Sequence, residues 1–405
     1  MDEFDVAVIG AGPVGVICAL ALARRGHSVL LVEAEPSVNR SPRAATTHPA
    51  TLEMLAELDL VADVTASGVV ARYFQFWDRP SGRKIAEFDH EILSKDTPYP
   101  FVVQCEQHKI ANLGLARLQT MPNASVAMQT RASGFTDDGK RVTLELASPN
   151  GTERRVTASY LVGCDGGRSF VRKGLGIEFE GFTHPERFIV LTTPFDFEAE
   201  KGFCYRNYFS DPDEWANLFK VAGDDLRGLW RVVFPTRINE TDEEALSDAA
   251  VQRRLQKFFP LGRPYEVAHR NIYNVHQRVA ASFRKGRVML AGDAAHVNNP
   301  IGGLGMNFGI HDAVSLAASI DGVLKGETDS GLDAYDRLRR PLNVEFVQSQ
   351  TIQNKKRLEE KDPGIREKNF ADLAATAADP VRHRAFLMRT SLLESVRSSA
   401  GKTAR

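Results

Sequence analysis

The N-terminal residues alternate between apolar runs of strand length and one amphipathic stretch. Residues 4–9 (FDVAVI) and residues 28–32 (SVLLV) are apolar runs. Between them, residues 13–25 repeat apolar side chains at helical spacing, and Gly26 supplies a helix stop. The pattern predicts a strand, a helix and a second strand, which is the start of a parallel sheet with helices on its faces.

The turn between the first strand and the helix carries G-x-G-x-x-G, formed by Gly10, Gly12 and Gly15. The first glycine permits a tight turn, the second lets backbone N–H groups approach a pyrophosphate, and the third lets helix and strand pack closely. Pro13 starts the helix, whose N-terminus carries partial positive charge. Glu33 ends the second strand, where it can bind a ribose and would repel a 2′-phosphate. The pattern predicts an NAD or FAD site; a plain glycine-rich turn is the alternative.

The middle of the chain reads as a meander of strands. Two dipeptides within residues 124–162 are hairpin turn signals, Asp138-Gly139 and Asn150-Gly151. Residues 159–176 then repeat the earlier pattern of an apolar strand, a turn at Asp165-Gly166, and a helix start. Asp165 is therefore either the N-cap of a helix or part of a second ligand-binding turn.

Residues 181–275 differ in composition and pattern, with many aromatic side chains in short runs that alternate between apolar and polar residues. This alternation predicts an antiparallel sheet with one face against a ligand or a core. In residues 203–209 it separates two sets of side chains: Phe203, Tyr205, Asn207 and Phe209 on one face, and Cys204, Arg206 and Tyr208 on the other. Most of the aromatic residues are expected to be core.

A second glycine-rich turn follows the apolar strand at residues 286–291. Gly292-Asp293 ends that strand, and apolar side chains at helical spacing follow from Ala313 to Val323. Ligands in sheets of this kind bind beyond the carboxyl ends of the strands. Residues 346–405 are charged and helical in pattern, with breaks at Pro363 and Pro380, and either cap the substrate domain or form a dimer contact.

Composition and charge exclude several classes of protein. The 405 residues carry a net charge of −1, which does not favour a nucleic-acid partner. The cysteines are scattered singly, without the spacing of disulfides or zinc ligands, so we expect no metal site and a cytoplasmic location: Cys18, Cys105, Cys164 and Cys204. The apolar N-terminal run is preceded by acidic residues and interrupted by glycines, so it predicts neither a signal peptide nor a membrane segment.

Three motifs together resemble the single-component (class A) flavoprotein aromatic hydroxylases of the para-hydroxybenzoate hydroxylase type. They are GAGPVG (10–15), CDGGRSFVR (164–172) and GDAAHVNNPIGGLGMNFGIHDA (292–313). The resemblance implies an α/β fold, in which a Rossmann-like FAD domain of the glutathione-reductase type carries an inserted, mainly antiparallel substrate domain and C-terminal helices. The expected division is 1–180 (with 72–105 contributing to the substrate side), 181–275, 276–345 and 346–405.

The resemblance implies that two separated segments bind one FAD. Asp293 would hold the ribityl chain, and the backbone of residues 303–307 would cradle the flavin pyrimidine edge, where fixed N–H dipoles stabilise the negative charge of the reduced ring. The implied FAD contacts are Gly10, Gly12, Pro13, Gly15, Glu33, Ala34, Arg43, Gln104, Asp165, Gly166, Asp293, Pro300, Gly303, Gly305, Met306 and Asn307. The chain departs from the family's Pro-Pro pair by having Asn299-Pro300.

The implied reaction is NAD(P)H- and O₂-dependent hydroxylation, through a flavin C4a-hydroperoxide, of a small phenolic or N-heteroaromatic ring that carries an acidic group. NADH and NADPH both remain open as co-substrate. Candidate residues at the reacting ring are His48, Tyr205, Arg231 and Pro300. The alternatives are a redox-silent FAD-binding protein, a flavin-dependent oxidase and a flavin-dependent halogenase. Halogenases carry a tryptophan-containing signature, and residues 228–235 of this chain (GLWRVVFP) do not match it.

Overall fold

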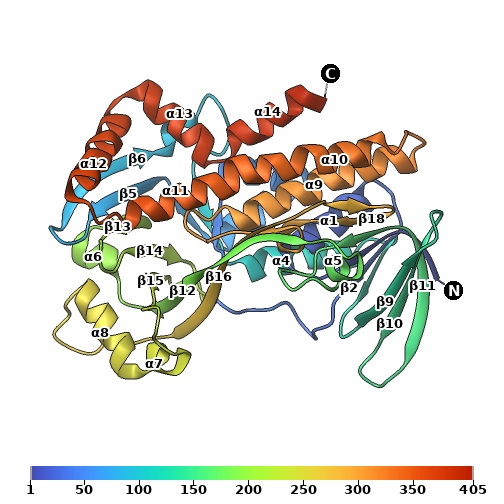
Figure 1. Ribbon diagram of the computed structural model, residues 1–405, viewed down its shortest axis with the longest axis horizontal. Helices are drawn as coiled ribbons and strands as arrows, with labels where there is room; N and C mark the ends of the chain where they lie inside the picture. The colour runs from blue at the N-terminus through green and yellow to red at the C-terminus, as the bar shows by residue number, and fades with distance from the viewer. Residues whose placement is uncertain (1, 404–405) are drawn as a thin grey trace.

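Two eight-stranded sheets and a layer of long helices organise the chain in the computed structural model, which describes residues 2–403 (Figure 1). The first sheet has the order β17-β18-β11-β1-β2-β8, and the hairpin β9-β10 joins it at β11. Its strands are β1 (Asp2–Ile9), β2 (Val29–Val32), β8 (Ala124–Ala127), β9 (Arg131–Asp137), β10 (Val142–Ala147), β11 (Glu153–Gly163), β17 (Arg284–Lys285) and β18 (Val288–Leu290). The two predicted hairpin turns connect β9, β10 and β11, as expected.

The central strands of the first sheet run parallel, because β1 pairs in parallel with β2 and β11, and β11 pairs in parallel with β18. Their carboxyl ends therefore lie at one edge of the sheet. The glycine turn, Glu33, Asp165 and Asp293 each follow one of these ends. Residues that are far apart in the sequence are brought to one edge by this topology.

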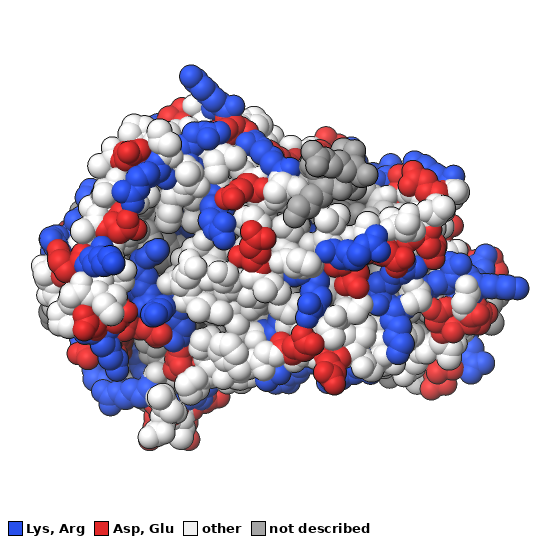
Figure 2. All heavy atoms as spheres, turned by 45° about the horizontal axis from the view of Figure 1, so that its top comes forward, with Lys and Arg blue, Asp and Glu red and all other residues white. Residues whose placement is uncertain are grey.

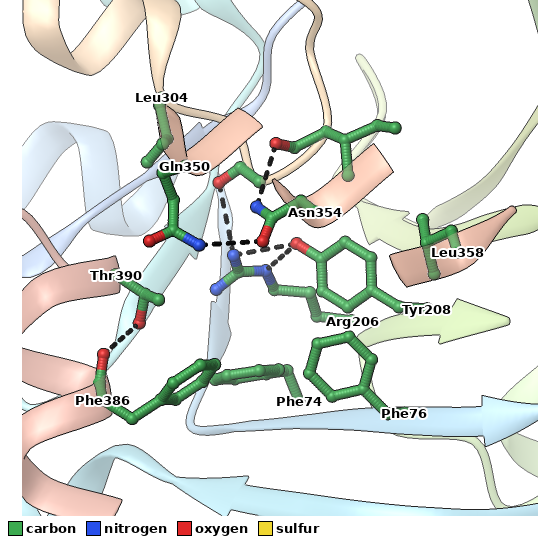
Figure 3. A pocket seen from close by; sticks show the side chains of 12 residues that line it. Phe74, Phe76, Arg206, Tyr208, Leu304, Gln350, Asn354, Leu358, Phe386 and Thr390 are labelled. Carbon is green, nitrogen blue, oxygen red and sulfur yellow. Dashed lines mark hydrogen bonds between the residues drawn. The ribbon is translucent and has the colours of Figure 1, made fainter. Parts of the chain in front are cut away.

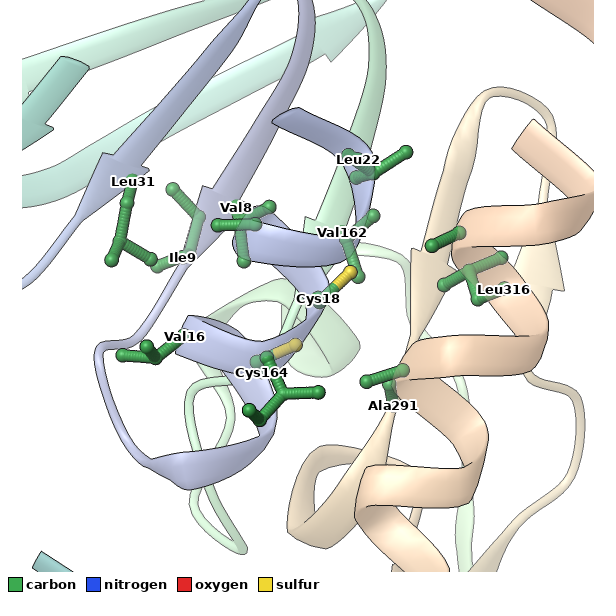
Figure 4. Close-up of a cluster of buried hydrophobic side chains, with 14 of the residues drawn as sticks. Val8, Ile9, Val16, Cys18, Leu22, Leu31, Val162, Cys164, Ala291 and Leu316 are labelled. Carbon is green, nitrogen blue, oxygen red and sulfur yellow. The ribbon is translucent and has the colours of Figure 1, made fainter. Parts of the chain in front are cut away.

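Helices α1 (Pro13–Arg24) and α9 (Gly305–Leu324) pack together against the first sheet. Apolar side chains from α1, α9 and the parallel strands fill the space between them, as Figure 4 shows for Cys18, Val162 and Leu316. Gly309 of α9 packs against Gly292, where an added Cβ would lie 3.0 Å from the Gly292 Cα. The two glycines thus let α9 approach the end of β18 closely.

The second sheet has the order β19-β16-β12-β15-β14-β13-β5-β6 and is antiparallel except where β13 meets β5. The strands are β5 (Tyr73–Asp78), β6 (Arg83–Asp89), β12 (Phe179–Thr193), β13 (Arg206–Ser210), β14 (Ala216–Val221), β15 (Leu229–Pro235), β16 (His269–Ala280) and β19 (His296–Val297). A small third sheet consists of β3 (Thr46–Thr47), β7 (Val102–Gln104) and β4 (Val69–Ala71).

The two faces of the second sheet have different neighbours. One face packs on short helices through Phe209, Trp230 and Phe234. We call the other the inner face; it contains the cross-strand row Arg206, Phe219, Arg231 and Thr192. The other helices that precede α9 are α2 (Pro49–Glu57), α3 (Val61–Ala66), α4 (Gln107–Gln119), α5 (Phe170–Gly174), α6 (Phe197–Lys201), α7 (Asp242–Leu246) and α8 (Asp248–Phe258), with 3₁₀ turns η1 (His90–Leu93) and η2 (Gly292–Ala294).

The C-terminal segment from Ser330 to Thr403 is helical, which confirms the helical pattern predicted from residue 346 onward. It comprises α10 (Ser330–Leu342), the π-helical turn η3 (Asn343–Gln348), α11 (Ser349–Leu358), α12 (Pro363–Ala378), α13 (Pro380–Thr390) and α14 (Leu393–Thr403). Pro363 and Pro380 each occupy a first helical position, where a missing N–H costs nothing. Helix α12 packs on β6 and α13 packs on η1, so this segment covers one end of the second sheet (Figure 1). The division into four ranges remains a proposal.

Charged side chains of both signs are interspersed on the face of the molecule in Figure 2, in keeping with the net charge of −1. Among the described residues, no helix has both the length and the apolar character needed to cross a membrane.

Candidate functional site

The glycine turn after β1 has the geometry that the fingerprint predicts. Gly10 has a positive φ of 103°, and a Cβ on Gly15 would lie 1.9 Å from the Gly10 carbonyl oxygen. A Cβ on Gly12, in contrast, would meet no atom within 4 Å. Gly12 is the N-cap of α1 and Pro13 is its first residue, with no side chain capping the N-terminus. The free N–H groups of α1 therefore face open space, which suits a phosphate.

Glu33 lies directly after β2 and is half-buried. Its Oε2 accepts a hydrogen bond from the backbone N–H of Ala11 (2.7 Å), and its Oε1 accepts one from that of Glu35 (2.9 Å). These bonds hold the carboxylate beside the glycine turn while leaving lone pairs that can accept ribose hydroxyls. Ala34, which follows it, is also half-buried.

The second motif forms a turn after β11. The Oδ2 of Asp165 accepts a hydrogen bond from Val171 N (3.1 Å), whereas its Oδ1 is buried and has no partner in the part of the chain that the structure describes. Ser169 caps α5, so Asp165 is not the N-cap. Gly166 has a positive φ of 77° and borders open space. An unpaired carboxylate oxygen at this position is free to accept a hydrogen bond from a ligand.

Asp293 lies in the turn η2, directly after β18. Surrounding protein raises the pKa of its carboxyl, and the charges of His296 and Arg43 oppose that rise. Its side chain is nevertheless open to solvent. A carboxylate that is surrounded by protein yet open to solvent is available to a ligand. Arg43, which is exposed, is close enough for its charge to influence this carboxylate.

A buried ion network that sequence reasoning missed supports this turn. Asp312 of α9 accepts hydrogen bonds from His296 Nε2 (2.6 Å), Arg339 Nε (2.7 Å) and the Gly292 N–H (3.2 Å). Burial alone would raise the pKa of Asp312, but the charges of Arg339 and His296 lower it overall. The Asp312 carboxylate thus ties α9 and α10 to the residues next to Asp293. The only sequence signal was the recurrence of His and Asp within the third motif.

The loop before α9 lies against residues 46–48. Asn307 Nδ2 donates to the carbonyls of Thr46 (2.7 Å) and Gly303 (2.6 Å). A Cβ on Gly303 would lie 2.9 Å from the Thr46 Cβ, so only glycine fits this approach. Gln104 Oε1 accepts a hydrogen bond from the Thr46 hydroxyl (2.8 Å), and its Nε2 is buried with no partner among the residues described. Pro300 is exposed at the turn, whereas Gly305 and the buried Met306 begin α9.

His48 is fully buried beside this loop. Its backbone N–H donates to Asn307 Oδ1 (2.8 Å), and its Nε2 lies 2.9 Å from the Gly302 carbonyl oxygen. A carbonyl only accepts, so Nε2 carries the proton and Nδ1, which has no partner among the described residues, is an acceptor. Burial, followed by the charge of Arg206, holds the pKa of His48 well below its usual range. The imidazole is therefore neutral at physiological pH.

The inner face of the second sheet supplies the opposite wall. Arg231 is buried, and its Nη1 donates to the Arg43 carbonyl (3.2 Å), while its Nε has no partner within residues 2–403. Desolvation lowers the pKa of this guanidinium. Tyr205 lies on the other face, where it packs against Trp230 and beneath Lys220. The structure therefore brings His48 and Arg231 to the site and leaves Tyr205 outside it. The side chains of residues 203–209 alternate between the two faces of the sheet as predicted. The face that meets the site is the one that carries Arg206, not the one that carries Tyr205.

A cavity of about 410 Å³, measured to its open mouth, adjoins this wall (Figure 3). It lies between the inner face, the loop before α9, and helices α11 and α13. Its lining is mainly apolar and aromatic, with a few polar groups: Phe74, Phe76, Arg206, Tyr208, Ile301, Gly302, Leu304, Gln350, Asn354, Leu358, Phe386 and Thr390. Sequence reasoning did not single out Arg206 or Tyr208.

The residues at this edge fit FAD. Two helix N-termini lie at this edge, a carboxylate follows each of three strand ends, and the buried Asp165 Oδ1 and Gln104 Nε2 lack partners among the described residues. An extended dinucleotide offers phosphates for the helix N-termini, hydroxyls for the carboxylates, and ring heteroatoms for the unpaired polar atoms. The individual FAD contacts remain a proposal.

Comparison with known proteins adds an independent line of evidence. Residues 3–350 match the protein family described as FAD binding domain. Para-nitrophenol 4-monooxygenase of Pseudomonas sp. (strain WBC-3) is 37% identical over 397 residues, which cover 96% of each chain. 6-Hydroxy-3-succinoylpyridine 3-monooxygenase of Pseudomonas putida (strain DSM 28022 / S16) is 32% identical over 367 residues, covering 89% of this chain and 90% of the relative. The crystal structure of p-nitrophenol 4-monooxygenase from Pseudomonas putida DLL-E4 aligns with a TM-score of 0.90 at 33% identity, covering 96% of this chain and 98% of that one.

Proposed function

Because this chain belongs to the FAD-binding family of single-component aromatic hydroxylases, we propose that it hydroxylates a small phenolic or N-heteroaromatic ring at the inner face. It is an FAD-dependent monooxygenase that uses NAD(P)H and O₂. The observation that carries the choice of site is that the inner face contacts two segments of the proposed FAD site: the loop after Glu33, through the Arg43 carbonyl, and the second glycine-rich turn, through the Gly302 carbonyl.

FAD, when bound, supplies the redox chemistry that links NAD(P)H oxidation to oxygen transfer. The chain's own part is to hold and orient it. The N–H groups at the start of α1 would bind the pyrophosphate, Glu33 the adenosine ribose, and Asp293 the ribityl chain. The N–H groups at the start of α9 would face the pyrimidine edge of the ring, where fixed dipoles stabilise negative charge without reorganising.

On the substrate side, His48 offers a neutral acceptor nitrogen. Its Nε2–H is held by the Gly302 carbonyl, so its unpaired Nδ1 can accept a hydrogen bond from a ring hydroxyl. The low pKa means that the imidazole orients this hydroxyl more readily than it retains the proton. Arg231, with an unpaired Nε, is proposed to pair with a carboxylate of an acidic substrate. A cytoplasmic location and a homodimer are further proposals.

Steady-state consumption of NADH or NADPH by the FAD-loaded enzyme tests this function. We expect slow oxidation without a substrate and marked stimulation by one class of hydroxylated aromatic or N-heteroaromatic compound, with a hydroxylated product. Stimulation without hydroxylation would indicate an oxidase. Failure of every phenol, aniline and hydroxypyridine to stimulate oxidation, with FAD bound, would favour a redox-silent flavoprotein.

A further inference from the structure

The guanidinium of Arg206 is buried without a counter-ion. Arg206 is 4% exposed, and among the described residues no carboxylate lies within ion-pair distance of it. Its Nε and Nη2 donate to the Tyr208 hydroxyl oxygen (3.1 and 2.9 Å), and Nη2 also approaches the Gly302 carbonyl (3.3 Å). These acceptors are neutral. A buried charge without an ionic partner is costly, so an anion that completes the site would be bound strongly.

The remaining nitrogen of Arg206 is available to a ligand. Nη1 has no hydrogen-bond partner within the part of the chain that the structure describes, and the guanidinium borders the cavity (Figure 3). Because the Nε–Nη2 edge already binds Tyr208, the two-pronged contact that a carboxylate prefers is not offered there. A single charged oxygen fits the free nitrogen better than a carboxylate does.

The cavity walls match an aromatic ring. Phe74 and Phe76 contribute aromatic faces from β5, and Phe386 contributes one from α13. The Arg206 guanidinium itself lies 4.9 Å from the Phe74 ring centroid, which holds its plane in place. The Tyr208 oxygen accepts from Arg206, so its O–H is left to donate to a second oxygen.

We propose that Arg206 determines specificity for ionised phenols, by binding the phenolate oxygen of a ring lodged in this cavity. The inference rests on the proposed function and names the form of the substrate that is bound: an ionised ring oxygen binds Arg206, whereas His48 Nδ1, which only accepts, is left to a ring hydroxyl that keeps its proton. It differs from the role proposed for Arg231, which lies elsewhere on the inner face, outside the cavity lining, and would meet a carboxylate. A phenolate is also the more electron-rich form of the ring, which favours attack by an electrophilic oxygen.

The histidines near Arg206 do not change their charge above pH 6, so they do not interfere with a measurement of how ligand affinity depends on pH. The titratable side chains that bond to the guanidinium or feel its charge are Tyr208 of β13, His48 before α2, His90 of η1 and Cys204, whose pKa burial raises to about 12. Burial and the charge of Arg206 lower the pKa of both histidines, that of His90 to about 3. They remain neutral, so a change in ligand affinity between pH 6 and 9 follows the ionisation of the phenol.

The experiment measures binding of 4-nitrophenol and its methyl ether, 4-nitroanisole, to the FAD-loaded enzyme by perturbation of flavin absorbance, without NAD(P)H. Wild-type affinity for 4-nitrophenol should rise as the phenol ionises, and affinity for 4-nitroanisole should not change with pH. Arg206→Gln should weaken 4-nitrophenolate binding about ten- to a hundredfold, because one charge-assisted hydrogen bond is lost. Binding of 4-nitroanisole should change far less.

Matched variants separate charge from packing. Lys220→Gln removes a cation from the same sheet on the opposite face, where Lys220 pairs with Glu198 at 2.9 Å, and should leave the preference intact. Arg206→Lys keeps the charge and should retain part of the preference. If Arg206→Gln loses FAD or unfolds, Arg206→Met, which keeps an apolar stem against Phe74, takes its place.

Three results would overturn the proposal. They are equal wild-type affinity for the two ligands, an unchanged preference in Arg206→Gln, and equal losses for both ligands, which would mean that Arg206 only shapes the cavity. Loss of the phenolate preference in Arg231→Gln but not in Arg206→Gln would assign the role to Arg231. Because binding is measured without turnover, phenolate binding without hydroxylation would contradict the proposed function and leave this inference standing.

Discussion

At the scale of single residues, the site is defined by carboxylates that have room for a ligand. Asp293 is accessible although surrounded by protein, and Glu33 is held by two backbone N–H groups. We expect Asp293→Ala and Glu33→Ala each to weaken FAD binding about ten- to a hundredfold, since a charge-assisted hydrogen bond contributes about 1.5–3 kcal/mol. Titration of the deflavinated protein with FAD, followed by quenching of flavin fluorescence, measures this.

The control for these two variants is Glu200→Ala, which removes an exposed carboxylate on α6, on the far side of the second sheet. Its FAD affinity should equal that of the wild type. Unchanged affinity in both Asp293→Ala and Glu33→Ala would mean that the cofactor lies elsewhere.

At the scale of elements, the turn between β1 and α1 contains one glycine that we expect to be needed for folding, Gly15, and one that we expect to be needed for FAD binding, Gly12. Gly15→Ala would place a Cβ 1.9 Å from the Gly10 carbonyl oxygen, whereas Gly12→Ala would meet no protein atom within 4 Å. We therefore expect Gly15→Ala to reduce the yield of folded protein or its thermal stability. Gly12→Ala should fold normally and bind FAD more weakly, because its methyl group enters the space proposed for the pyrophosphate.

Circular dichroism on heating reports folding, and FAD titration reports binding, so the two effects can be told apart. Gly331→Ala, at the start of α10, has no crowding atom nearer than 4.0 Å and is the matched control for both measurements. Normal FAD affinity in Gly12→Ala would contradict the placement of the pyrophosphate at α1.

At the scale of the whole molecule, buried neutral histidines make stability depend on pH. Burial lowers the pKa of His90 and His311 to about 3, far below the value of about 6.5 for an unfolded chain. Between these pKa values the unfolded state binds more protons than the folded state. The contribution of these histidines to the free energy of unfolding is therefore fully present above about pH 6.5 and is lost as the pH falls. The loss approaches about 1.4 kcal/mol per pH unit for each histidine.

Urea unfolding at saturating FAD between pH 7.5 and pH 5 measures this loss. His311→Gln should reduce the slope by about one histidine's share, and His269→Gln, which replaces an exposed histidine, should not. An unfolding free energy that stays constant down to pH 5 would contradict the expected protonation of these groups.

Much of the cofactor side was predictable because its signals are local. The main segments proposed to hold FAD each consist of a strand end, a turn and a following helix or strand. The residues that specify these features are adjacent in the sequence. The Asp312 network was not predictable, because His296, Arg339 and Asp312 meet only when α9 and α10 fold against β18. The substrate side was predicted in part: alternation separated Arg206 from Tyr205, but could not say which face meets the cofactor.

The sequence by itself determined the α/β class, the parallel strands and the FAD-binding turns, since hydrophobic period and glycine position act over a few residues. Only the tertiary structure decided which side chains form the substrate wall. Sheet order places β13 and β15 on either side of β14. The loop before α9 packs on Arg206 and the loop that carries Arg43 packs on Arg231, so the face of these two arginines meets the site. The cavity is likewise a tertiary product, because α11 and α13 return from the end of the chain to line it. Contacts between such distant residues depend on how the layers pack, and no local pattern encodes them.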